Sequence, residues 1–179
     1  MSRTIRRLCI AALSLGLVAG AGAAPAGAQH HAAQQVPDIT DAAFLAQAAQ
    51  SNQFEIVTGR LATQRARTRV VRRLGRQFVE HHTAQLRLGA AVAAKLGIQA
   101  PPTLNPRQQA IVDRLERRRG LRFDRAWLKA QLVAHEEALA LHLAGALTGD
   151  TPDVRTLAIT GLPVVATHLG ELRVLTGRL

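Results

Sequence analysis

Three histidines and a glutamate stand where a helix would turn them toward a hydrophobic interior. His82 lies four residues after Phe78 and four before Leu86, on what reads as an apolar helical face. His135 and His168 hold the same kind of position between aliphatic residues in two later segments. Imidazole nitrogens and carboxylate oxygens together suit zinc, iron, manganese or copper. The candidate ligands of one transition metal ion are therefore Glu55, His82, His135 and His168.

The depth of these residues in a bundle follows from the helical rise of about 1.5 Å per residue. Measured from the end where the first two predicted helices meet, Glu55 lies about 15 Å up and His82 about 21 Å. If the connection to the later helices crosses the bundle, His135 lies about 16 Å and His168 about 12 Å from that end. Helix ends are uncertain by a few residues, so we expect the four side chains to form one layer.

A structural role for the same residues stays open. A buried histidine can bond a backbone carbonyl, and Glu55 can simply pair with one imidazole. The Glu-x-x-His motif of carboxylate-bridged di-iron proteins is missing, and His168 and Glu171 stand in the reverse order. A nucleophile elbow and a phosphate loop are also missing. The sequence thus favours a binding protein over an enzyme.

Three further residues are expected around this layer, in its second shell or at its rim. His81 precedes His82 and points about 100° away from it on a helix, so both cannot face one ion. His142 lies two turns from His135, too far to share a metal with it. Glu171 completes this surrounding set.

The elements that must position these residues are helices. Apolar and small residues recur at three- and four-residue spacing from Asp38 onward, and we expect no strand. A proline in the last segment, Pro163, is expected to kink its helix. Four long helices and a short one are predicted: from Thr40 or Asp41, from Thr68 to Gly97, from Asn105–Pro106 to near Gly120, from Asp124 to Leu147, and from Thr151–Pro152 onward.

These helices predict an all-α, ferritin-like four-helix bundle. The first pair and the last pair are each joined by a short turn and should be antiparallel. The connection over residues 98–123 is long and contains the short helix. If it crosses the length of the bundle, the long helices run up, down, down and up.

The beginning of the chain is typical of an exported protein. Residues 1–28 combine three arginines, an apolar stretch and a small-residue cleavage pattern, which predicts a signal peptide. Residues 29–39 should be a flexible leader, and residues 40–177 the bundle domain. The single cysteine, Cys9, falls in the signal peptide, so the mature chain can form neither disulfides nor thiolate metal sites. We expect a periplasmic or secreted protein.

The charge of the chain is strongly positive, with 23 Lys and Arg residues against 12 Asp and Glu. Aromatic residues make up 3% of the chain, and we expect no aromatic platform for stacking bases among the arginines, which argues against nucleic acid as a partner. A cluster of arginines suits an anionic lipid or lipopolysaccharide surface, although a solvated basic face is the simpler interpretation. The arginines expected to converge at one end of the bundle are Arg65, Arg67, Arg69, Arg72, Arg73, Arg118, Arg119 and Arg122.

Four segments in this order resemble an exported bacterial family: "FLAQAAQSNQFEIVTGRLATQRA", "VRRLGRQFVEHHT", "RFDRAWLKAQLVAHEEAL" and "LPVVATHL". The family is the domain of unknown function 4142, described as ferritin-like. The resemblance implies that Glu55, His82, His135 and His168 match its recurring Glu, its two Asp-His pairs and its C-terminal His-Leu. His81 and Ala134 stand where the two aspartates are expected.

Two functions follow from the sequence. The leading hypothesis is an exported ferritin-like protein that binds a metal ion in its core without turnover. The alternative is an interaction module that docks on anionic envelope surfaces through its arginine-rich end, with purely structural histidines. A homo-oligomer is compatible with either function.

Overall fold

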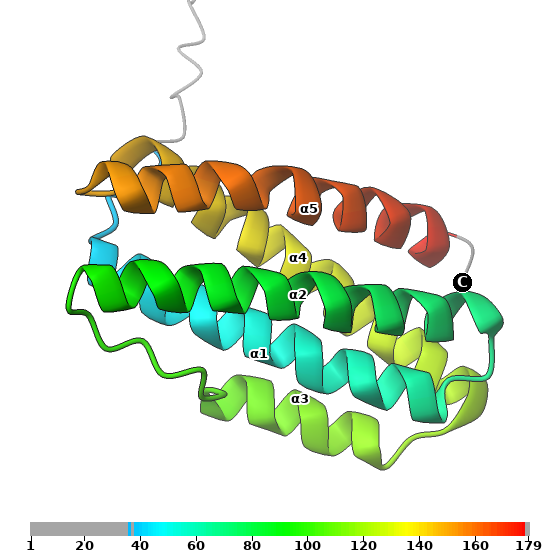
Figure 1. Cartoon of the computed structure of the whole chain (residues 1–179). Helices are drawn as coiled ribbons and strands as arrows, with labels where there is room; N and C mark the ends of the chain where they lie inside the picture. The colour runs from blue at the N-terminus through cyan, green and yellow to red at the C-terminus, as the bar shows by residue number, and fades with distance from the viewer. Residues whose placement is uncertain (1–35, 37, 178–179) are drawn as a thin grey trace, which may run out of the picture. The chain divides into compact units, whose positions relative to one another are not determined.

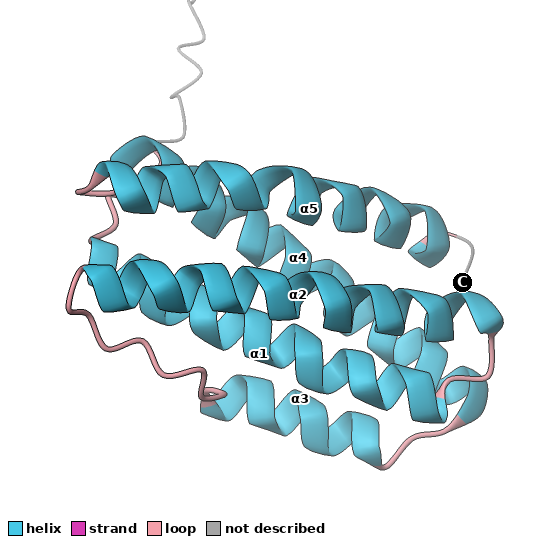
Figure 2. Cartoon of the chain, viewed as in Figure 1, coloured by secondary structure: helices cyan, strands magenta, loops and turns pink. Residues whose placement is uncertain are grey.

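The computed structural model describes residue 36 and residues 38–177, and this part of the chain is helical without any strand (Figures 1 and 2). The predicted signal peptide and the first residues of the predicted leader lie outside the described residues. No helix in the described part is both long enough and apolar enough to span a membrane. The helices are α1 (Asp41–Arg65), α2 (Arg69–Lys95), α3 (Pro106–Glu116), α4 (Gly120–Thr148) and α5 (Pro152–Thr176).

Side-chain caps begin four of the five helices at the predicted residues. The Thr40, Thr68 and Thr151 side chains accept hydrogen bonds from the backbone N–H groups three residues later, at the starts of α1, α2 and α5. Asn105 and Gln108 form a reciprocal capping box at the start of α3. Each cap satisfies an N–H group that the helix itself leaves without a partner.

The start of α4 differs from the prediction. This helix was expected to begin at Asp124, but α4 begins earlier, at Gly120, and its N-cap Arg119 makes no side-chain cap bond. The Asp124 carboxylate is buried and instead accepts from the backbone N–H groups of Arg67 and Thr68, both at 2.9 Å. Asp124 therefore ties α4 to the turn between α1 and α2, a partner that local sequence cannot reveal.

The predicted crossover topology is confirmed. α1 packs mainly on α2, and α4 packs mainly on α5. Figure 1 shows α2 antiparallel to α1 and α5 antiparallel to α4, while the connection through α3 returns along the bundle, so that α2 and α4 run in the same direction. The turn between α1 and α2 thus lies at the same end of the bundle as the start of α4.

Close approach of α1 and α2 depends on two glycines. A Cβ atom built on Gly59 would lie 2.8 Å from the Gly75 carbonyl oxygen, and one on Gly75 would lie 2.7 Å from the Gly59 carbonyl oxygen. A larger residue at either position would force the backbones apart. This contact brings the polar residues of α1 within reach of those of α2.

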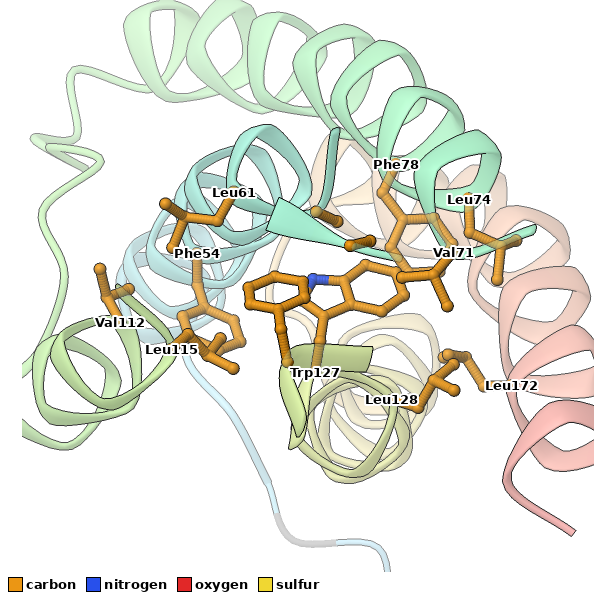
Figure 3. Close-up of a cluster of buried hydrophobic side chains, with 13 residues drawn as sticks. Phe54, Leu61, Val71, Leu74, Phe78, Val112, Leu115, Trp127, Leu128 and Leu172 are labelled. Atoms are coloured by element: carbon orange, nitrogen blue, oxygen red, sulfur yellow. The ribbon is translucent and has the colours of Figure 1, made fainter. Parts of the chain in front are cut away.

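The hydrophobic core has two parts. The larger one, here called the aromatic cluster, surrounds Trp127 and includes Phe54, Phe78 and Phe123 (Figure 3). Part of it comes from α3, whose Val112 and Leu115 are buried there. The smaller, alanine-rich cluster lies toward the other end of the helices and consists of Phe44, Leu45, Ala48, Ala93, Val154, Leu157 and Ala158.

Along α2, α4 and α5 the predicted histidines lie between these two clusters in residue order. Beside Pro163 on α5, Val165 is buried and Val164 is half-buried. α5 continues as a helix through Pro163.

Candidate metal centre

Three of the four predicted ligands come together in the core. His82 of α2, His135 of α4 and His168 of α5 each offer a ring nitrogen, and these three nitrogens lie within 4.8 Å of one another. All three side chains are at most 3% exposed. Phe78 closes one side of the group, with its ring centre 4.8 Å from that of His135 and 4.4 Å from that of His168. We call these three residues the histidine group.

His82 has one nitrogen that is held and one that is free. Its Nδ1–H donates to Asn52 Oδ1 at 2.8 Å, since an amide oxygen can only accept. Its Nε2 then carries a lone pair, and this atom is buried without a hydrogen-bond partner among the described residues. An unpaired buried acceptor is costly in a folded protein, so the position calls for a functional explanation.

Asn52 was not identified from the sequence. It lies four residues after Ala48 and three before Glu55, so it stands on the inward face of α1. That spacing predicts that the Asn52 side chain points inward. It indicates a site residue only when a histidine on another helix is known to lie opposite. Asn52 holds the His82 ring in a single tautomer.

Hydrogen bonds also set the tautomers of the other two histidines. His135 Nδ1–H donates to the Gln131 carbonyl oxygen at 3.0 Å, which leaves a lone pair on its Nε2. That nitrogen lies 3.3 Å from His168 Nδ1, so the shared hydrogen belongs to His168. The other His168 nitrogen, Nε2, then accepts from His81 Nδ1 at 2.9 Å.

All three imidazoles of the histidine group are neutral near pH 7, because burial disfavours the charged form. Burial lowers the pKa of His135 to about 4 and, together with the neighbouring His135 and His81, that of His168 to about 3. Burial and then the surrounding histidines also lower the pKa of His82 well below its ordinary value. Neutral imidazoles keep the lone pairs that a metal ion requires.

Glu55, the fourth predicted ligand, lies behind His135 rather than beside the three nitrogens. Its carboxyl oxygen is 3.8 Å from His135 Nδ1, on the side of the ring that bonds Gln131. It is 1% exposed, and burial raises its pKa well above the usual value, while a hydrogen bond from Gln131 opposes part of that rise. The Gln131 amide lies between this carboxyl and Thr58 Oγ1.

The three residues expected around the layer have different surroundings. His81 is half-buried and stacks on His168, with ring centres 5.1 Å apart and planes 5° from parallel. Glu171 accepts from Gln77 Nε2 at 3.3 Å. His142 is buried, and its Nδ1–H donates to the Ala158 carbonyl oxygen at 2.9 Å, so it belongs to the core and not to the rim.

The predicted basic residues divide into two groups. Arg65 donates to the Glu116 carbonyl oxygen, and Arg72 donates to the Ala66 and Arg67 carbonyl oxygens, so these two side chains stabilise the turns. The others are exposed at the end of the bundle where the α1–α2 turn meets the start of α4. They are Arg67, Arg69, Arg73, Arg118, Arg119 and Arg122.

Comparisons with known proteins agree with this fold. Residues 26–175 match the family model described as domain of unknown function (DUF4142). The comparison with curated proteins found no match. The crystal structure of a DUF305 fragment from Deinococcus radiodurans superposes with a TM-score of 0.69 at 20% identity, covering 80% of this chain and 100% of that one. CopM in the Cu(II)-bound form superposes with a TM-score of 0.67 at 14% identity, covering 79% and 99%. At these identities the two structures establish the helical-bundle fold alone.

Proposed function

We propose that this chain, which belongs to the DUF4142 family, binds one copper ion between His82, His135 and His168. The observation that carries the proposal is the buried His82 Nε2, an acceptor with no partner among the described residues that stands beside two further imidazoles. The protein would do this outside the cytoplasm, after removal of residues 1–28.

The donor set favours copper among the metals that the sequence suggested. The three nitrogens come from neutral imidazoles, and the buried carboxyl of Glu55 lies behind His135. Copper stands highest in the affinity order of divalent metals for nitrogen ligands, and manganese prefers oxygen. A monovalent copper ion also costs less to bury than a divalent one. The similarly folded CopM is described in a Cu(II)-bound form, which agrees with this choice.

The surrounding residues prepare the histidines for an ion. Asn52 and the Gln131 carbonyl oxygen hold the outer nitrogens of His82 and His135, so their inner nitrogens keep lone pairs. His168 must move its hydrogen from Nδ1 to Nε2, and His81 must move its own from Nδ1 to Nε2, so that His168 Nε2–H can donate to His81 Nδ1. Glu55 supplies a buried carboxyl that a nearby cation would favour in its ionised form.

A competition titration tests the proposal. Purified protein is titrated anaerobically with Cu(I) against a chromophoric chelator, and separately with Zn(II), Fe(II) and Mn(II). We expect one tightly bound copper ion per chain and its loss in His82→Gln and His168→Gln. Copper at about 100 times its Kd should also raise the unfolding free energy by about 2.7 kcal/mol in the native protein only.

The matched control is His142→Gln, which removes an equally buried histidine that bonds a backbone carbonyl. This variant should bind copper as the native protein does. Metal binding that is equally weak in the native protein and in the His82 variant would exclude the site. Preferential binding of zinc would keep the site but change the assigned metal.

A second function is supported by the exposed arginines at the end of the bundle. Six predicted arginines are exposed there, and they form no ion pair with the described residues. Leu121, in the same segment as Arg118 to Arg122, is 48% exposed. We propose that this end docks on anionic lipid surfaces.

Cosedimentation with phosphatidylglycerol vesicles tests this docking. Arg67→Gln/Arg69→Gln should weaken binding, and Arg87→Gln/Lys95→Gln, two exposed positions away from this end, should weaken it less. Arg65 and Arg72 are left unchanged because they bond carbonyl oxygens of the turns. Equal loss of binding in the two double variants would show that only net charge matters and would exclude a defined docking end.

A further inference from the structure

A groove of about 720 Å³ lies outside the four-helix core, between α1, α3 and α4. It exists because the crossing connection lays α3 beside α1 and α4 without filling the space among them. Its volume falls within the range of about 300–1,000 Å³ that is typical of small-molecule sites. Its apolar lining is formed by Phe54, Ile111, Leu115, Val133, Ala134 and Leu141.

The charged lining of the groove is asymmetric. Near the start of α3, Arg107 is neutralised by an ion pair with Glu137 at 2.8 Å. Near the end of α3, Arg114, Arg118 and Lys129 line the groove and form no ion pair with the described residues. One end of the groove therefore carries three positive charges, and the other end carries an ion pair with no net charge.

A positive end joined to an apolar lining complements one kind of molecule. A simple inorganic anion would leave the apolar residues exposed, whereas a neutral hydrocarbon would leave the three cations without a partner. A stacking platform for nucleic acid is missing, because Phe54 is the single aromatic side chain of the lining and is 2% exposed.

We propose that this groove binds a single-chain anionic amphiphile, such as a long-chain fatty acid. The anionic head lies among Arg114, Arg118 and Lys129, and the hydrocarbon chain extends over the apolar lining toward Gln47 and Gln50 of α1. The site is separate from the histidine group, none of whose members lines the groove, so its occupancy does not depend on the proposed metal.

Displacement of a fluorescent fatty acid, cis-parinarate, by palmitate tests the proposal at concentrations below micelle formation. We expect saturable binding with one site per chain and a decrease in affinity of roughly fourfold for each methylene removed from the competitor. Hexadecanol and hexadecyltrimethylammonium should compete poorly, because they lack the anionic head. Competition by lysophosphatidylglycerol, a single-chain amphiphile with a phosphate head, shows whether the groove prefers a phosphate or a carboxylate.

Two variants address the two halves of the groove. Arg118→Glu/Lys129→Glu should weaken palmitate binding more than tenfold, and Ala130→Trp should block the chain while leaving the charges in place. Arg60→Glu/Arg87→Glu, which changes two exposed arginines outside the groove, is the matched control and should bind normally. Circular dichroism confirms that each variant is folded.

Three results would overturn the proposal. One is the absence of palmitate binding to the native protein, and the second is equal weakening in both charge-reversed double variants. The third is binding to phosphatidylglycerol vesicles without binding to monomeric amphiphiles, which would assign the groove to a membrane surface instead.

Discussion

Two buried environments of this molecule contain histidine, and they differ in what the imidazoles bond. His142 donates to the Ala158 carbonyl oxygen, packs edge-on against Phe44 and lies against Gly161. In the histidine group the inner nitrogens face one another: those of His135 and His168 share a hydrogen bond, and His82 Nε2 has no partner among the described residues. Burial is similar in the two environments.

The comparison shows that a buried histidine is not by itself a site. The environment of His142 is closed, since its Nδ1–H bonds a backbone carbonyl and a glycine makes room for its ring. In the histidine group, Asn52 and Gln131 bond the outer nitrogens of His82 and His135, and the inner nitrogen of His82 has no partner among the described residues. This arrangement leaves lone pairs where an ion could lie.

Gly161→Ala, which alters the surroundings of His142, should have the largest effect on stability. A Cβ atom at this position would overlap the His142 ring, so the ring must move and lose its carbonyl bond. We expect the unfolding free energy to fall by about 1–3 kcal/mol, although alanine favours a helix more than glycine does. Urea denaturation measures the loss.

Combining this substitution with His142→Ala provides the control, because the overlap then disappears. In that background Gly161→Ala should be neutral or stabilising. Copper binding should be retained by Gly161→Ala, because the histidine group is separate. An equal cost of Gly161→Ala in both backgrounds would show that the His142 ring is not the cause.

Acid should destabilise the folded protein, because the buried histidines of both environments are neutral. In the unfolded chain the histidines are protonated near pH 6.5. In the folded chain the pKa of His135 is about 4 and that of His168 is about 3, so both are protonated only at lower pH. The unfolded state therefore binds more protons in this window, so stability is complete above pH 6.5 and decreases as the pH falls, by up to about 1.4 kcal/mol per unit for each histidine. Denaturant titrations of the metal-free protein measure this slope.

Glu55 has the opposite effect, since its raised pKa makes the folded state retain a proton that the unfolded chain releases above about pH 4.5. The histidine contribution is therefore isolated by comparing the native protein with His135→Gln, whose stability should depend less steeply on pH between 6.5 and 4. An unchanged slope in that variant would mean that His135 binds its proton over the same pH range in the folded and unfolded states.

Asn52→Ala should leave the His82 ring less firmly oriented. His82 Nδ1 loses its acceptor at 2.8 Å, so the ring no longer keeps a single tautomer and orientation. We expect the copper affinity to fall by about 10- to 100-fold while one binding site remains. Asn52→Asp, which keeps an acceptor oxygen, should restore most of the affinity in the same titration.

His81→Asp should have the smallest effect, in the opposite direction. A carboxylate at this position can accept the hydrogen that His168 Nε2 must carry when its Nδ1 binds an ion. We expect the copper affinity to increase by about tenfold at most. His81→Asn, an uncharged acceptor, should lie between the aspartate variant and the native protein.

Much of the fold could be predicted from local chemistry. Thr40, Thr68, Asn105 and Thr151 begin helices in the structure because a cap bond spans only three residues. The crossover followed from the length of one connection and from where the short helix stands in it. Asp124 was assigned wrongly because the N–H groups that it bonds, at Arg67 and Thr68, belong to a distant turn.

The sequence by itself determined which faces of the helices are buried and placed His82, His135 and His168 at similar depths, because helical periodicity and rise are properties of the chain. Only the tertiary structure decided which nitrogen of each ring is occupied, that Glu55 lies behind His135, and that His142 bonds a carbonyl. Hydrogen bonds between helices depend on the rotation and separation of neighbouring helices to within an ångström, and residue spacing along one helix does not contain that information.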